Sequence, residues 1–194
     1  MPTFPVASAP LESAASWVVK PDDGVGCLDA RCVSRDALRV ALANNTLPAG
    51  YVAQPYIEGM AASLSLICRQ GSAWLLSCNR QRVGLHGGEF QLEGVVVNGI
   101  ARAVAEFEVL AERIASALPG LWGYVGVDLI MAPDGPLVLE VNPRLTTSYV
   151  GLRAALAVNP AALVLALSRE DPKVPDQSMK RAPVNVDIEL GCAA

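Results

Sequence analysis

The chain has 194 residues, of which 52% are hydrophobic and 18% are charged, and its formal net charge is −4. This composition supplies enough apolar material for one compact domain, or for two small lobes that share a cleft. It argues against a nucleic-acid surface, because phosphate contacts need clusters of Lys and Arg that the sequence lacks. No apolar run reaches the length that spans a bilayer, so no membrane contact is expected.

The N-terminal segment and the cysteines point to a cytoplasmic protein. Residues 1–16 are rich in Pro, Ala and Ser and lack the basic and apolar regions of a signal peptide, so we expect an irregular lead-in. The five cysteines form no Cys-x-x-Cys pair, and His86 is the one histidine of the sequence. A zinc site is therefore not expected, and the cysteines are interpreted as reduced thiols, mostly buried.

The first half of the chain is predicted to be rich in strands. Residues 17–20 form an apolar strand that ends at Pro21, and residues 22–26 form a glycine-containing turn. Ser34 is a candidate N-cap for a helix that runs to about Asn44. Three further strands are expected, at residues 51–57, 63–69 and 73–79. A flexible loop is expected at residues 86–88.

The second half begins with a helical pattern. From Ile100 to Leu118 apolar residues recur at spacings of four and three, which predicts an amphipathic helix with Asn98 as its N-cap and an end at Pro119. Another helix is expected from Pro160, where proline is tolerated in the first turn, and a closing strand at residues 184–190. Strands and helices alternate irregularly rather than as βαβ units, so the fold class is α+β.

A β-hairpin is predicted around the turn sequence Ala132-Pro133-Asp134-Gly135. A turn centred on Asp134 pairs Asp128 with Glu140 and places Asn142 on the same face. The alternate positions then form a wholly apolar face, which must be the core side. Its members are Val127, Leu129, Met131, Leu137, Leu139 and Val141, whereas Ile130 and Val138 lie with the acids.

The acid pair in this hairpin predicts a metal site. Two carboxylates directly opposite each other have Cβ atoms about 5 Å apart, and like charges there are destabilising. Mg²⁺ (or Mn²⁺) would compensate, because it takes one or two carboxylates together with substrate phosphates. We therefore expect Asp128, Glu140 and Asn142 to bind the metal, and Arg144 to reach a phosphate or acyl oxygen. A solvated acid pair on an exposed strand is the alternative interpretation.

Other residues are weaker candidates for substrate binding. Lys20 leaves a strand beside a glycine loop, an arrangement that can hold phosphates, although a lysine that simply extends into solvent fits as well. The segment at residues 54–59 ends a strand at a proline and could expose backbone groups to an adenine edge, with Glu58 near a ribose; a plain edge strand is the alternative. Arg80 and Arg82 follow an apolar strand and are candidate contacts for an anionic substrate, although isolated arginines of this kind are more often surface charges. The glycines match neither a Rossmann nor a P-loop pattern.

In this order the segments VVKPDDGVGC, QPYIEG, GYVGVDLI and LEVNPRLTTSYVGL resemble the ATP-grasp superfamily over roughly residues 17–168. The resemblance is nearest to the tyramine–glutamate ligase branch, known from methanofuran biosynthesis. It implies two α+β lobes around ATP, a small one at residues 17–60 and a large one with the metal site at residues 61–194. The residues implied to contact ATP are Lys20 on its phosphates and Gln54, Tyr56, Ile57 and Glu58 on the nucleoside; Asp128, Glu140 and Asn142 would hold Mg²⁺.

The resemblance implies an ATP-dependent ligase that joins a small carboxylate, such as glutamate, to an amine through an acyl phosphate, with Arg144 and Arg80 as catalytic contacts. The superfamily's preceding N-terminal domain is apparently missing, because sixteen residues precede Trp17. Uncovered apolar surface would then favour a homo-oligomer, such as a dimer. A second hypothesis is therefore a reduced or inactive ATP-binding module that needs a partner or the missing domain. A third, a carboxylase-type subunit, shares the Glu-x-Asn-Pro-Arg run, but the sequence at residues 146–149 resembles the ligases more.

Overall fold

The computed structural model describes residues 1–100, 104–169 and 182–189, and the chain packs as two compact units. Unit 1 is Met1–Glu58 with Val83–Glu93, and unit 2 is Gly59–Arg82 with Gly94–Ala194. Strands β6 (Ser72–His86) and β7 (Glu89–Val97) each contribute residues to both units. The α+β class is confirmed. The predicted functional lobes stay a prediction; the packing break lies at residues 58/59, close to the expected boundary, and residues 83–93 return to unit 1.

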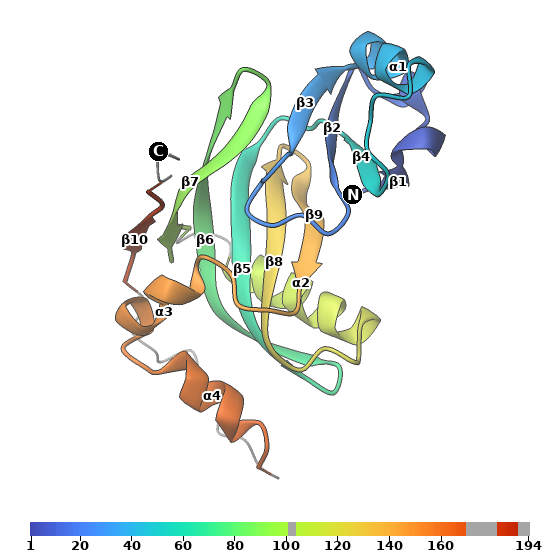
Figure 1. The fold of residues 1–194 in the computed structure, drawn as a ribbon. Helices are drawn as coiled ribbons and strands as arrows, with labels where there is room; N and C mark the ends of the chain where they lie inside the picture. Colours follow the sequence, from blue (N-terminus) through green and yellow to red (C-terminus); the bar gives the residue numbers. More distant parts are fainter. Residues whose placement is uncertain (101–103, 170–181, 190–194) are drawn as a thin grey trace. The chain divides into compact units, whose positions relative to one another are not determined.

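Unit 1 is an antiparallel sheet covered by one helix (Figure 1). Its strands in hydrogen-bonded order are β1 (Phe4–Pro5), β4 (Tyr51–Pro55), β2 (Ser16–Pro21) and β3 (Arg31–Ser34), followed by the start of β7. Helix α1 (Arg35–Ala43) places Leu38 against Trp17 and Ala53 in the core. Ser34 caps this helix as predicted, since its Oγ accepts a hydrogen bond from the Ala37 N–H at 3.2 Å.

The N-terminal segment is part of the unit 1 fold, and the expectation of an irregular lead-in was wrong. Strand β1 pairs with β4, and two 3₁₀ turns follow, η1 (Val6–Ser8) and η2 (Leu11–Ser13). Phe4 lies edge-on to Trp17 with ring centroids 6.3 Å apart, and the apolar residues of the turns pack on the same core. The high Pro and Ala content obscured these few spaced apolar anchors in the sequence.

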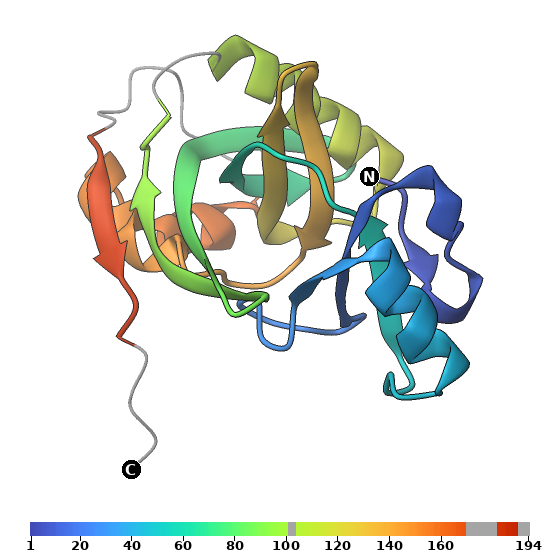
Figure 2. The ribbon, with the colours of Figure 1, turned by 90° about the horizontal axis from the view of Figure 1, so that it is seen from above.

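Unit 2 is a second antiparallel sheet with a helix on one face (Figure 2). The strands in order are β7, β6, β5 (Met60–Arg69), β8 (Gly123–Ala132) and β9 (Gly135–Asn142), and β10 (Val184–Asp187) pairs with β7. Helix α2 (Val104–Ala117) packs Phe107, Ala111 and Ala115 against the apolar side chains of β5 and β8. Helices α3 (Tyr149–Leu156) and α4 (Pro160–Ala166) follow β9, and α3 contacts β10.

Several element boundaries differ from the predictions. Asn98 does not cap a helix, because it has φ 53° and its N–H donates to the Asn79 Oδ1 at 3.2 Å. Residues 101–103 lie outside the described residues, and α2 ends at Ala117, before Pro119, as expected. Helix α4 begins at Pro160, as expected, and Asn159 caps it by accepting a hydrogen bond from the Ala161 N–H at 3.1 Å. Strands β3 and β7 and helix α3 were not predicted, and His86 ends strand β6 instead of lying in a loop. The predicted closing strand is β10; residue 190 lies outside the described residues.

The hairpin of β8 and β9 pairs Asp128 with Glu140 as predicted, but it does so through a different turn. The turn is a two-residue one, with Ala132 opposite Gly135, and a bulge between Asp128 and Leu129 inserts Leu139 into β9. Between turn and bulge the faces are therefore exchanged. Val138 pairs with Leu129 and packs against the core, whereas Leu137 pairs with Ile130 on the opposite face, so the predicted placement of Leu137 and Val138 was wrong.

The four described cysteines are reduced thiols: Cys27 and Cys32 are half-buried, Cys68 and Cys78 are buried, and Cys192 lies outside the described residues. Burial, together with the nearby carboxylate of Glu112, raises the pKa of the Cys68 thiol to about 11, so this thiol is unreactive near neutral pH.

Among the described residues no single helix is long and apolar enough to cross a membrane. The bent pair α3 and α4, which meets at 95°, meets that test only by combined length and composition.

The bulge leads to a prediction that separates the two registers. Val138→Lys should lower the free energy of unfolding by about 2 kcal/mol, because it places an ammonium group against the apolar core. Leu137→Lys should cost less than about 1 kcal/mol, because its position faces away from that core. Urea unfolding of both variants measures the difference. The opposite order of stabilities would contradict the bulged register.

Candidate functional site

Polar side chains from four strands form two rows on the face of the unit 2 sheet that lies opposite α2. The strand register places Asn79, Ser63, Asp128 and Glu140 in one row, and Ser77, Ser65, Gly126 and Asn142 in the next. We call these eight residues the polar face. The other side of the same strands carries the apolar core, with Leu64, Val127 and Leu129. Strict alternation along β5 and β8 thus separates a packed face from a hydrogen-bonding face.

Asp128 is held between two side-chain amides. The Gln81 Nε2 donates to its Oδ1 at 2.8 Å, and the Asn142 Nδ2 donates to its Oδ2 at 2.9 Å. Asn142 is 4% exposed, so its amide has little freedom to turn. Because each amide uses its NH₂ group on Asp128, the amide oxygens of Gln81 and Asn142 are the ends that remain for a cation. Glu140 lies directly opposite Asp128 in the register.

This donor set fits Mg²⁺. All of its side chains offer oxygen atoms, which hard cations prefer, and Mg²⁺ needs no more than one or two carboxylates when phosphates supply the other ligands. In the part of the chain that the structure describes, no group of three or more His, Cys, Asp or Glu is placed to hold a metal. The structure brings together the three predicted ligands, Asp128, Glu140 and Asn142, and metal binding itself stays a prediction.

The two predicted arginines differ in their placement. Arg144 lies two residues after the end of β9; it is exposed, and its N–H donates to the Asn142 carbonyl at 2.8 Å, which holds the turn beside the acids. Arg80 pairs with Ala62, whose side chain belongs to the apolar core, so Arg80 leaves the sheet on the α2 side. Its neighbour Gln81 occupies the polar side instead. The placement favours Arg144 and does not favour Arg80 as a contact for a substrate at Asp128.

Gln81 is the site residue that sequence reasoning missed. The predicted strand ended at Asn79, whereas β6 continues to His86. The signal was present in the sequence as an alternation of polar residues, Ser77, Asn79 and Gln81, which places all three on one face of a strand.

The predicted nucleotide contacts lie in unit 1. Lys20 pairs with Val52, and Val18 pairs with Gln54, so Lys20 and Gln54 share the sheet face opposite the buried Trp17. The Gln54 side chain is 4% exposed, and its Nε2 donates to the Thr3 Oγ1 at 2.8 Å. Lys20 is half-buried. The shared face is consistent with one ligand that contacts both residues, and their roles stay predictions.

In the segment after β4, one backbone N–H group is already used by the sheet and the carboxylate residue is exposed. The Tyr56 N–H donates to the Ser16 carbonyl at 2.9 Å, so this group serves the sheet and is not offered to an adenine edge. The Tyr56 ring stacks on Phe90, with centroids 6.4 Å apart and planes at 22°. Glu58 is exposed and Ile57 half-buried. An adenine contact by this segment would therefore involve backbone groups other than the Tyr56 N–H.

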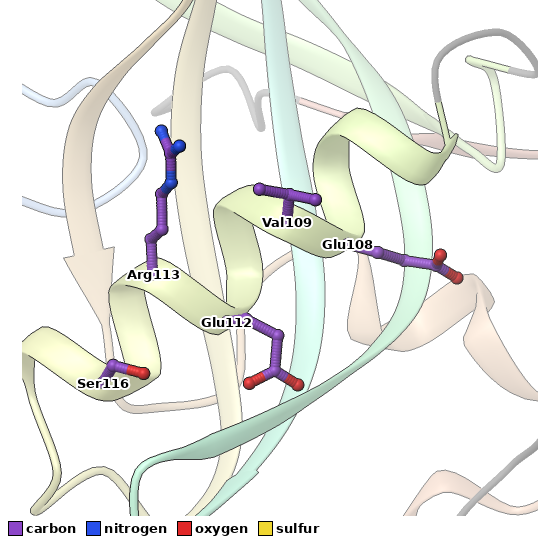
Figure 3. A pocket seen from close by; sticks show the side chains of 5 residues that line it. All are labelled: Glu108, Val109, Glu112, Arg113 and Ser116. Carbon is purple, nitrogen blue, oxygen red and sulfur yellow. The ribbon is translucent and has the colours of Figure 1, made fainter.

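A shallow surface hollow on α2 is unrelated to these residues. Its lining comes entirely from the outer side of that helix (Figure 3), namely Glu108, Val109, Glu112, Arg113 and Ser116. The helix lies on the core side of the unit 2 sheet, away from the polar face. One helix surface offers no enclosing walls, and we assign no function to it.

The family profile described as an ATP-grasp domain matches residues 1–148. Among curated proteins, the tyramine–L-glutamate ligase of Methanocaldococcus jannaschii is 34% identical over 112 residues, which are 56% of this chain and 34% of that protein. The Methanocaldococcus fervens ligase of the same name is 36% identical over 112 residues, 56% of this chain and 35% of that protein. The chain thus spans about a third of the length of the curated relatives that it matches.

Solved structures give the same fold. An ATP-grasp superfamily protein from Archaeoglobus fulgidus is 26% identical with a TM-score of 0.61, over 97% of this chain and 58% of that one. An L-amino acid ligase from Bacillus licheniformis is 25% identical with a TM-score of 0.57, over 77% of this chain and 37% of that one. The biotin carboxylase domain of a Hydrogenobacter thermophilus carboxylase, solved with MgADP, is 13% identical with a TM-score of 0.67, over 88% and 40%; this last likeness shows the fold alone.

The clamp on Asp128 leads to a stability prediction. Gln81→Glu would replace a donor by a second carboxylate within hydrogen-bond distance of Asp128, and should lower the free energy of unfolding by about 1–2 kcal/mol at pH 7.5. The facing carboxylates raise each other's folded-state pKa, so the deficit is present at high pH and shrinks as the pH falls and one of them binds a proton. Urea unfolding between pH 7.5 and 5 measures this.

Arg80→Glu serves as the matched control, because it adds a carboxylate to the adjacent position on the other face. It should not show the same recovery at low pH. A Gln81→Glu protein that is as stable as the wild type at pH 7.5 would contradict the contact between Gln81 and Asp128.

Proposed function

This chain belongs to the ATP-grasp family, and on that basis we propose that it binds ATP with Mg²⁺ and joins a carboxylate to an amine. The observation that carries the proposal is the polar face of unit 2. Asp128 and Glu140 lie opposite each other on neighbouring strands, Asn142 and Gln81 orient Asp128, and Arg144 leaves the strand end beside them. The acid pair is supported by two amides, and the other side of its strands packs on the apolar core. This arrangement fits a site for a magnesium–phosphate complex better than it fits a solvent-exposed acid pair.

The proposed reaction has two steps. An oxygen of the carboxylate substrate attacks the γ-phosphorus of ATP, the bond to the β,γ-bridging oxygen breaks, and ADP leaves with that bond's electron pair. The nitrogen of the amine then attacks the acyl carbon of the acyl phosphate. The C–O bond to phosphate breaks, inorganic phosphate leaves, and the nitrogen gives up one proton to form the amide. No covalent bond to the protein is needed, so positioning and charge stabilisation carry the catalysis.

The chain's own residues have distinct parts in this proposal. Mg²⁺, when bound by Asp128, Glu140 and the Asn142 amide oxygen, would neutralise charge on the phosphates. Arg144 would stabilise the negative charge on the transferring phosphoryl group. Gln81 would hold Asp128 in place through the 2.8 Å hydrogen bond. Lys20 would bind phosphate, and the segment from Gln54 to Glu58 would contact the nucleoside.

The relatives' names suggest where to look for substrates. Two are tyramine–L-glutamate ligases and one is an L-amino acid ligase, so we propose an amino acid, glutamate first, as the carboxylate and a primary amine as its partner. We further propose that the chain acts in the cytoplasm and associates with a second copy. Because the match covers about a third of the curated relatives, an ATP-binding module that acts with another polypeptide is the second candidate.

Calorimetric titration with ATP and Mg²⁺ tests the first half of the proposal. The wild-type chain should bind, EDTA should weaken binding, and the Asp128→Ala/Glu140→Ala double variant should bind MgATP at least tenfold more weakly, because it lacks both carboxylate ligands. Equal affinity in the double variant would contradict the metal site. Arg80→Ala, on the other face of the sheet, is the control and should bind like the wild type.

ADP release with glutamate and a panel of amines, tyramine included, tests the second half. Release that requires both an acid and an amine, with amide product detected by mass spectrometry, is the expected result. MgATP binding without turnover on any pair would favour the ATP-binding module over the ligase.

A further inference from the structure

The segment that carries Arg144 is fastened to the polar face by a closed ring of four hydroxyl groups. The Tyr124 hydroxyl donates to the Ser65 Oγ at 3.1 Å, and the Ser65 Oγ donates to the Ser148 Oγ at 3.5 Å. The Thr146 Oγ1 lies 3.1 Å from the Ser148 Oγ and 2.9 Å from the Tyr124 hydroxyl. With Ser148 donating to Thr146 and Thr146 to Tyr124, each hydroxyl donates once and accepts once within the ring, so all four are satisfied.

The ring joins two different parts of unit 2. Ser65 and Tyr124 belong to β5 and β8, whereas Thr146 and Ser148 belong to the segment after β9. Ser65 is fully buried and Ser148 is 2% exposed. Asn79, also fully buried, donates to Ser65 at 3.1 Å and to Ser63 at 3.3 Å, so the ring is tied to the row that contains Asp128. The Tyr149 ring adds an edge-on contact to Tyr124 at 5.1 Å.

Gly126 provides the space in which Thr146 sits. A Cβ atom at this position would lie 2.4 Å from the Thr146 Cγ2, closer than a Cβ atom normally comes to another heavy atom, and 3.1 Å from the Thr146 Oγ1, which is a tight contact. Gly126 is the one member of the polar face without a side chain, and Thr146 fills that gap from the following segment. The close approach explains why this position of β8 needs a glycine.

Arg144 therefore lies on a short span between two fixed ends. Asn142 is buried and bonded to Asp128 on one side, and Thr146 is held by the ring on the other. The three residues between them, Pro143, Arg144 and Leu145, are exposed. Because the span is short, the Arg144 backbone can adopt few positions. The fixed positions of Asn142 and Thr146 therefore limit where the Arg144 guanidinium can reach.

We propose that Thr146 is a positioning residue that, through the hydroxyl ring, fixes Arg144 for contact with the terminal phosphate of ATP. The proposal rests on the function proposed above for its phosphate contact, while the anchoring of the segment can be tested without any ligand. Thr146→Val keeps the shape of the side chain but removes the hydroxyl, so Ser148 loses an acceptor and Tyr124 loses a donor. Thr146→Ser keeps the hydroxyl and should preserve the ring.

Amide hydrogen exchange of the ligand-free chain tests the anchoring. The N–H groups of Tyr149, Val150 and Gly151 donate to the carbonyls of residues 146–148, so their exchange reports on this segment. Exchange in peptides covering residues 143–151 should be roughly fivefold faster in Thr146→Val, as expected for the loss of one net hydrogen bond. Thr146→Ser and the neighbouring control Thr147→Val should stay within about twofold of the wild type. Unchanged exchange in Thr146→Val would overturn the proposal.

A double-mutant cycle on MgATP affinity tests the contact with phosphate. Thr146→Val and Arg144→Ala should each weaken binding about fivefold or more, and Thr146→Val should have no further effect in the Arg144→Ala background. If Thr146 has a merely structural role, the fold losses of MgATP affinity in the two single variants should multiply in the double variant, and that result overturns the positioning of Arg144. An Arg144→Ala variant with wild-type affinity overturns it as well. A wild-type chain that binds no MgATP refutes the proposed function and the phosphate contact, and leaves the exchange experiment to decide the anchoring.

Discussion

The pairing of Asp128 with Glu140 is the constraint on which the rest of the candidate site depends. An antiparallel ladder places paired residues on one face, so this single pair decides which side of β8 and β9 carries the acids and which side carries the core. The two-residue turn alone would not produce it. The bulge at Leu139 shifts the register by one residue between the turn and the acids, and thereby allows a tight turn and an acid pair in the same hairpin.

The same register explains why unit 2 keeps a polar surface next to a dense core. Across β6, β5, β8 and β9, every side chain of the two polar rows except the glycine can form hydrogen bonds, and the intervening positions pack on α2. Buried polar groups are tolerated only when they find partners. Here the amides and hydroxyls supply partners for one another, although the Ser77 Oγ has none within the described residues. The two amide hydrogen bonds in this network leave Asp128 oriented before any ligand arrives.

Much of this arrangement could be predicted from the sequence, and the parts that could not have physical reasons. The cap at Ser34 follows from a local pattern, because helix caps are decided by neighbouring residues. The opposition of Asp128 and Glu140 was predicted through a turn centred on Asp134, and it holds because the bulge offsets the shorter turn that the hairpin has instead. The bulge at Leu139 was not predictable. The regular hairpin and the bulged hairpin both give β9 an apolar face, and only the tertiary packing distinguishes the two registers. Gln81 was missed because the predicted strand stopped early, although the alternation continues through it.

The hydroxyl ring shows a different limit of sequence reasoning. Residues 146–149 resembled a family segment as a string, but their partners Ser65 and Tyr124 lie far away in the chain, and no local pattern joins them. In retrospect, Gly126 indicates that the two parts of the chain meet. A glycine in the middle of an apolar strand weakens the strand, and its presence indicates that another part of the chain approaches closely there. In this chain that approach brings Thr146 to the sheet, two residues after the arginine that the proposed chemistry requires. The geometry of the arginine is therefore set by a residue that need not touch any substrate.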